Sequence, residues 1–275
     1  MTDTVKVIKN EQWSVKQTMA KIHNKEITKP KYQRKKKWDI LPHKNNVPNE
    51  KSYIEFLFNT GNSVHAITFG EETTAIGKYY TNIDGNNRIN AIKHFMDKPF
   101  EIFNDYLTEL NNYINTICLS NDVKILLKNI FYQLSYNDII NFKYNKYFNE
   151  HGYIDIYNNE LKIFRDDIEV LIENIQDKLK LNGTDNFDIN VKINVNLFEG
   201  YNTDELCRTF EEINKYNSKL TETELLACRL YNETHFDIMD NVYKTEIKEC
   251  IKDYYTDKSD NEVLECYMFN QERDN

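Results

Sequence analysis

The chain has 275 residues and a formal net charge of −9, with 40% hydrophobic and 29% charged residues and only seven glycines and four prolines. This composition is typical of a globular protein with a sizeable core, and the acidic balance disfavours nucleic-acid binding by the whole surface. No apolar run of about 18 residues and no apolar leader follow Met1, so no membrane contact is expected and we predict an intracellular, cytoplasmic protein.

Cysteine and histidine usage narrows the chemistry further. The five cysteines form no C-x-x-C pair and lie mostly in apolar segments, which indicates buried, reduced thiols in a reducing compartment. The six histidines are scattered without an H-E-x-x-H motif, so a structural zinc site is not expected. The richness in Asn, Lys, Ile and Tyr is typical of an AT-rich genome, such as that of a virus.

Two helices are expected in the first sixty residues. Ser14 and Gln17 have the spacing of a capping box, which predicts a helix running to about His23. Ser52 is expected to cap a second helix, and Gly61 suits its C-terminal end.

Two short β-prone segments follow, at residues 64–69 and 78–83. The second runs directly into Asp84-Gly85-Asn86-Asn87-Arg88, after which apolar residues recur at helical spacing. The predicted order is therefore strand, Asp-Gly turn and helix.

Residues 101–186 are mainly helical by pattern, with one helix capped by Asp122 and a long helix over residues 161–179. Strict alternation from Ile189 to Leu197 then predicts a half-buried strand. Because such a strand needs a partner, we expect it to join the same sheet as residues 64–69 and 78–83. Asp204 is expected to cap the next helix, and Thr221 with Glu224 forms another capping box.

These elements predict an α/β (α+β) fold, in which a small sheet with helices carries a large helical insertion. The core is expected over residues 1–100, the helical insertion over 101–186, and the returning strand and helices that complete the core over 187–235. Residues 236–275 are expected to form an acidic C-terminal extension.

The turn after the second strand has the composition of an anion site. The first N–H groups of a helix carry partial positive charge, and Gly85 lets a phosphate approach the backbone. Asn86 and Asn87 offer side-chain amides, while Arg88 can donate two hydrogen bonds to one phosphate. Asp84 would hold Mg²⁺ or a water beside it. The alternative interpretation is a plain Asp-Gly turn with Asn capping a helix. Since Arg88 lies in a first helical turn, its replacement by Ala is expected to cost little stability.

A basic run upstream offers further donors. Six of the nine residues from Lys29 to Lys37 are Lys or Arg, and Gln33, Arg34 and Trp38 belong to the same region. Arg34 and Arg88 are expected to point into one pocket and share a phosphate, with Gln33 contributing to binding. The alternative interpretation of this run is a solvated loop.

Three motifs in order resemble one family. Residues Ile27 to Arg34 with Trp38-Asp39 are similar to the P-x-[YF]-Q-R…W segment of the N-terminal domain of GmrSD-type restriction endonucleases. The turn Asp84-Gly85-Asn86-Asn87-Arg88 resembles that family's D-G-Q-Q-R signature. Phe210 to Asn214, followed by Leu220 and Glu224, is similar to its F-x-x-x-N…L-x-x-x-E segment. The resemblance covers roughly residues 12–100 and 187–230.

This resemblance implies a ParB/sulfiredoxin-like fold, with nucleotide binding and NTP hydrolysis at the turn. It also implies a role in defence against foreign DNA, often together with a separate nuclease. Both signature glutamines are asparagine here, one methylene shorter, so binding is better supported than hydrolysis. His235 stands alone, without an H-N-H constellation, so cleavage of DNA by this chain is not expected.

Two functional hypotheses remain open from the sequence. In the first, the chain is an NTPase or nucleotide-gated switch, with NTP and Mg²⁺ as cofactors. Arg34 and Arg88 bind phosphates, Asn86 and Asn87 orient them, and Asp84 is the catalytic and metal-binding residue. In the second, it is a non-catalytic module that binds DNA or a partner protein through the basic segment from Lys29 to Trp38.

Overall fold

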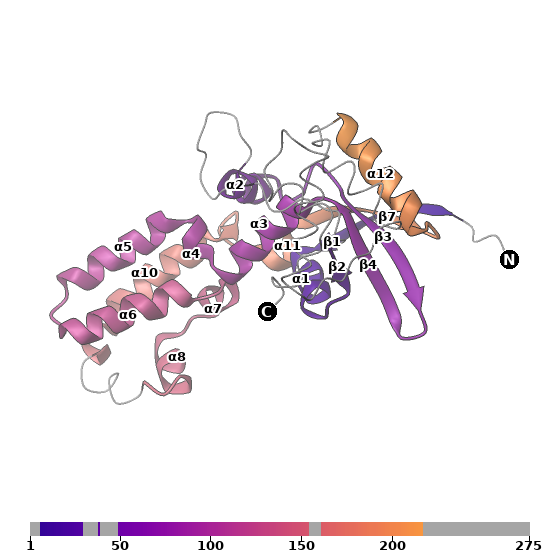
Figure 1. The fold of residues 1–275 in the computed structure, drawn as a ribbon. Coiled ribbons are helices and arrows are strands. Elements are labelled where there is room, and N and C mark those ends of the chain that lie inside the picture. Colours follow the sequence, from indigo (N-terminus) through magenta and orange to yellow (C-terminus); the bar gives the residue numbers. More distant parts are fainter. Residues whose placement is uncertain (1–5, 30–37, 39–48, 154–160, 217–275) are drawn as a thin grey trace, which may run out of the picture.

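The structure is a computed structural model, and it describes residues 6–29, 38, 49–153 and 161–216. It contains a five-stranded sheet with helices packed around it and a group of helices extending to one side (Figure 1). The predicted α+β class is confirmed. No helix in the described part of the chain is long and apolar enough to span a membrane.

The main sheet joins strands from both ends of the described chain, in the order β1-β7-β3-β4-β2. Its strands are β1 (Val7–Ser14), β2 (Ile27–Thr28), β3 (Ile67–Thr74), β4 (Gly77–Asp84) and β7 (Lys192–Glu199). The β1–β7 and β3–β4 pairs are antiparallel, and the β3–β7 and β2–β4 pairs are parallel. The prediction that the strand near residue 190 returns to this sheet is therefore confirmed. A separate two-stranded sheet pairs β5 (Lys180–Leu181) with β6 (Asp185–Asn186).

Each face of the sheet is covered by different elements. One face buries Trp13, Phe69 and Tyr80 in the main hydrophobic core. The other face packs Ile83 against Leu206, Cys207 and Phe210 of helix α12 (Thr203–Tyr216). α12 approaches this face closely because Gly70 has no side chain: a Cβ there would lie 2.4 Å from Leu206 Cδ1.

The other helices precede the predicted insertion, lie within it or, for the last of them, follow it directly. They are α1 (Val15–His23), α2 (Glu50–Thr60), α3 (Asn86–Asp97), α4 (Pro99–Ile102), α5 (Asn104–Thr116), α6 (Asn121–Gln133), α7 (Tyr136–Ile140), α8 (Tyr144–Glu150), η2 (Lys162–Phe164), α10 (Arg165–Lys178) and α11 (Phe187–Asn190). In Figure 1, α4 to α8 and α10 lie together on one side of the sheet. Phe95 of α3 contacts the rings of Phe103, Tyr136 and Phe187, so these helices share the main core. The exact domain boundaries stay a prediction.

The capping predictions had mixed outcomes. The capping box of Ser14 and Gln17 is present at the start of α1, and Gly61 ends α2 with φ 67°. Ser52, however, does not cap α2. Asn49 does so, and its side-chain oxygen accepts a hydrogen bond from the Ser52 backbone N–H at 2.9 Å. An Asn in extended conformation is as good a cap as Ser, and it lies one turn earlier.

Later boundaries were also shifted. Asp122 lies in the first turn of α6, which follows Ser120 at the cap position. Asp204 lies within α12, and the cap contacts there are the reciprocal hydrogen bonds between Asn202 and Glu205. The predicted capping box at residues 221 and 224 lies outside the described residues.

Strand boundaries were displaced as well. The strand predicted over residues 64–69 begins at Ile67, and the one predicted from Ile189 begins at Lys192. Ile189 instead belongs to α11, and its side chain is 47% exposed. The alternating pattern of the strand extends by chance into this helical turn, which is why the predicted start was too early. β1 was not predicted at all.

Candidate functional site

The predicted phosphate turn forms a tight junction between β4 and α3. Gly85 is the N-cap of α3 with φ 102°, a backbone conformation that is unfavourable for residues other than glycine. A Cβ at this position would also lie 2.9 Å from Ile67 Cγ2. The first helical hydrogen bond runs from the Ile89 N–H to the Gly85 carbonyl at 2.9 Å. Glycine is thus required here both by conformation and by space.

Arg88 lies in the first turn of α3 and is anchored at three points. Its Nη1 donates to the backbone carbonyls of His65 and Ala66 at 2.8 and 2.9 Å. Its Nη2 donates to Asp84 Oδ2 at 2.6 Å, forming an ion pair across one helical turn. The side chains of Arg88 and Asp84 are 14% and 29% exposed. Arg88 therefore ties the junction to the segment that precedes β3.

This geometry corrects the expectation that Arg88→Ala would cost little stability. That expectation considered only helix propensity, whereas the guanidinium here satisfies two backbone carbonyls and one carboxylate. A guanidinium carries five N–H groups. Three are used within the described part of the chain, and the Nε–H and one Nη2–H remain for a ligand. Arg88 and Asp84 are brought together, as the sequence predicted, but they contact each other.

The structure describes only some of the remaining predicted site residues. Asn86 and Asn87 lie in the first turn of α3, and both are partly exposed. Gln33 and Arg34 lie outside the described residues, so their convergence with Arg88 stays a prediction.

Trp38, at the end of the basic run, lies beside α2. Its ring contacts the ring of Tyr53 edge-on, with 5.5 Å between centroids. Burial raises the pKa of Tyr53 to about 12, and the charge of Arg88 opposes that shift. The Tyr53 hydroxyl is buried and has no hydrogen-bond partner among the residues described here. Tyr53 of α2 thus lies between Trp38 and the surroundings of Arg88.

The opposite end of α3 carries a polar cluster that the sequence analysis missed. His94 Nδ1 lies 2.6 Å from Glu50 Oε2 on α2, and Nε2 lies 2.8 Å from Glu101 Oε2 on α4. Hydrogen bonds from Lys98, His94 and Tyr132 lower the pKa of Glu101 to about 2. No local pattern pointed to this cluster, because its members lie on three different helices.

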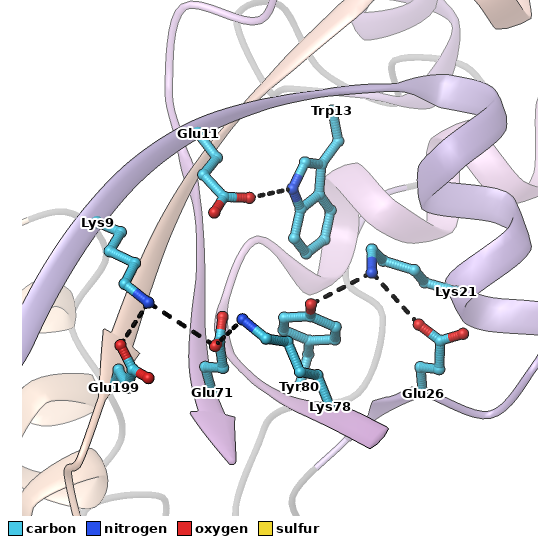
Figure 2. A network of polar contacts seen from close by, with 9 residues as sticks. All are labelled: Lys9, Glu11, Trp13, Lys21, Glu26, Glu71, Lys78, Tyr80 and Glu199. Atoms are coloured by element: carbon cyan, nitrogen blue, oxygen red, sulfur yellow. Dashed lines mark hydrogen bonds and ion pairs between the residues drawn. The ribbon is translucent and has the colours of Figure 1, made fainter. Parts of the chain in front are cut away.

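A second polar network covers one face of the sheet (Figure 2). The Glu71 side chain is only 1% exposed, and its Oε1 accepts from Lys78 at 2.5 Å and lies 4.0 Å from Lys9. Lys9 also pairs with Glu199, and this hydrogen bond is the main cause that raises the pKa of Lys9. The pairing of β1 with β7 and of β7 with β3 brings these side chains together on one face of the sheet. The sequence did not predict the network, because β1 and its pairing were not predicted.

An aromatic pair borders the same network. Lys21 Nζ lies over the rings of Trp13 and Tyr80, at 4.9 and 4.4 Å from their centroids, and bonds Glu26 at 3.3 Å (Figure 2). Trp13 Nε1 donates to Glu11 at 2.7 Å. Both aromatic rings are buried. This cluster stabilises the packing of α1 on the sheet through cation–π contacts.

No protein-family model matches the chain, and no curated protein or solved structure is significantly similar to it. The resemblance to the N-terminal domain of GmrSD-type restriction endonucleases therefore stays a prediction.

Proposed function

We propose that this protein binds a nucleoside triphosphate at the turn from Asp84 to Arg88 and acts as an NTPase or nucleotide-gated switch related to DNA restriction. The observation that carries the proposal is the strand–glycine–helix junction, with an arginine fixed in the first helical turn. This arrangement combines a helix N-terminus with a guanidinium that retains two N–H groups.

The Asp84–Arg88 ion pair gives the proposed site a resting state. In the nucleotide-bound state, the Asp84 side chain turns away and a phosphate oxygen accepts from Arg88 Nη2 in its place, while Nη1 keeps its bonds to the His65 and Ala66 carbonyls. Asp84 is then available to Mg²⁺. A single carboxylate fits this ion, because Mg²⁺ in nucleotide sites is held largely by phosphates and water. Partly exposed ion pairs contribute little to stability, so the exchange is inexpensive.

The test is a panel of nucleoside triphosphates, each with and without Mg²⁺, in a thermal-unfolding assay. A ligand at about 100 times its Kd stabilises the folded state by about 2.7 kcal/mol. For a protein of this size that corresponds to a rise of roughly 5–10 °C. Phosphate release, measured with the nucleotide that gives the largest rise, then separates hydrolysis from gating.

Variants at the turn are compared by calorimetric affinity, since Arg88 also supports the fold. Arg88→Gln is expected to weaken nucleotide binding about ten- to hundredfold by removing a charge-assisted contact. Asp84→Asn is expected to remove the Mg²⁺-dependent part of the affinity and spare the rest. The matched control is Arg165→Gln on α10, which removes another arginine paired with a carboxylate four residues on, Glu169.

Two results would overturn the proposal. If no nucleotide raises the unfolding temperature, nucleotide binding is wrong and the result favours the second hypothesis, a non-catalytic module that binds DNA or protein through the Lys29–Trp38 segment. If Arg88→Gln and Arg165→Gln bind nucleotide equally well, the site lies away from this turn.

A further inference from the structure

Within the described part of the chain, β1 is an edge strand of the main sheet. It spans eight residues, from Val7 to Ser14, and pairs on one side with β7. Its first six residues are exposed or partly exposed, and Ile8 keeps 53% of its exposure. No other strand of the described chain lies on its outer side. Such an edge is a template for another strand.

The hydrogen-bond pattern shows which residues face outward. The Val15 N–H donates to the Val191 carbonyl, and this pair continues the β1–β7 register. In an antiparallel ladder, hydrogen-bonded pairs recur at every second residue. The odd-numbered residues of β1 therefore bond β7, whereas Ile8, Asn10 and Gln12 direct their backbone groups outward. Consistently, the outward N–H of Ser14 is taken by the Gln17 side chain at 2.8 Å.

We propose that two copies of this protein associate by antiparallel pairing of their β1 strands about a two-fold axis at Asn10. In this register Asn10 pairs with Asn10 of the second copy, and Ile8 pairs with Gln12 of the second copy. All three outward residues then become hydrogen-bonded pairs, and the two sheets join into one.

The charges of β1 favour its own copy as the occupant. In the same register Lys9 lies opposite Glu11 of the second copy, and Glu11 lies opposite Lys9. These are non-hydrogen-bonded pairs, in which side chains approach most closely. A strand lacking a carboxylate opposite Lys9 loses this complementarity, so the edge selects a self-complementary partner. Val7, 38% exposed, also lies opposite Trp13 of the second copy.

Sedimentation equilibrium of the full chain across micromolar concentrations tests the association. We expect a dimer in the wild type. Asn10→Pro removes the outward N–H at the two-fold axis without removing a β1–β7 bond, and proline is tolerated on edge strands. It is expected to give a monomer, whereas the matched control Asn10→Ala, which keeps the N–H, stays dimeric.

A charge exchange tests the register and guards against misfolding of the proline variant. Lys9→Glu and Glu11→Lys each place like charges opposite one another at two symmetric positions, and each is expected to raise the dimer dissociation constant about ten- to hundredfold. The double variant restores opposite charges and is expected to regain the dimer. It does so although the intrachain contacts of Lys9 with Glu199 and Glu71, and of Glu11 with Trp13, stay lost. A monomeric wild type, a dimer unaffected by Asn10→Pro, or a double variant no better than the single ones would overturn the proposal.

Discussion

Helix α3 is held in different ways at its two ends. At the C-terminal end, His94 lies between Glu50, whose side chain is fully buried, and Glu101, so that α2, α3 and α4 are joined. At the N-terminal end, Arg88 pairs with a partly exposed Asp84 and with two carbonyls of a neighbouring segment. Removing the partner of a fully buried carboxyl group is costly, whereas a pair with a partly exposed carboxylate exchanges partners more readily. The C-terminal end is therefore expected to contribute more to stability, and the N-terminal end is the one at which the proposed function requires an exchange of partners.

The largest expected effect tests the buried end. His94→Ala leaves the carboxyl groups of Glu50 and Glu101 facing each other without the imidazole that bonds both of them. We expect the free energy of unfolding to fall by about 3–5 kcal/mol, measured by urea denaturation. The control is His151→Ala, which removes an exposed histidine stacked on Tyr147. Equal losses in the two variants would show that the buried cluster contributes no special stability.

The next effect concerns the guanidinium at the other end. Arg88→Ala removes three hydrogen bonds and leaves the His65 and Ala66 carbonyls without them. The expected loss is about 2–3 kcal/mol in the same denaturation assay, less than for His94→Ala. A loss within about 0.5 kcal/mol, typical of ordinary surface positions, would mean that these contacts do not hold in solution.

Gly85→Ala tests the backbone of the same junction. The new Cβ meets Ile67 and forces an unfavourable φ, so we expect a loss of about 2 kcal/mol. Gly183→Ala is a matched control, because its φ is +73° but nothing lies within 4 Å of the added Cβ. Conformational strain alone is expected there, at about 1 kcal/mol. If Gly85→Ala is no worse than Gly183→Ala, the contact with Ile67 does not constrain the turn.

The smallest effect is a pH dependence at the buried end. The pKa of Glu101 is about 2 when folded and about 4.3 in an unfolded chain. Its stabilisation is therefore complete above about pH 4.3 and is lost as the pH falls toward 2. Glu101→Gln is expected to flatten the acid limb of a stability–pH curve, while Glu109→Gln, at an exposed position, is not. An unchanged acid limb in Glu101→Gln would contradict the assignment.

The sequence predicted features that depend on near neighbours. Three such features were confirmed: the capping box at Ser14, the glycine after β4 and the alternation of β7. Each is determined by a pattern only a few residues long. The return of β7 to the sheet was also predictable, because a half-buried strand requires partners.

Side-chain contacts between distant residues and the edge strand β1 were not predictable. The contact between Glu50 and His94 joins residues 44 positions apart, and Arg88 reaches the His65 carbonyl across 23 positions. β1 was missed because six of its eight residues lie at an exposed edge, where no alternation is required. Its strand character comes from β7, which supplies the pairing.

The position of β7 between β1 and β3 sets an order of events during synthesis of the chain. Gln12 of β1 bonds Asn194 of β7 across 182 positions, and β1 has no other partner strand in the described sheet. The β3–β4 hairpin can form early, whereas β1 must wait until β7 leaves the ribosome. Contacts of such long range fold slowly, and an unpaired strand is open to misassociation in the meantime. The nascent protein is thus expected to depend on chaperones until residue 199 has emerged.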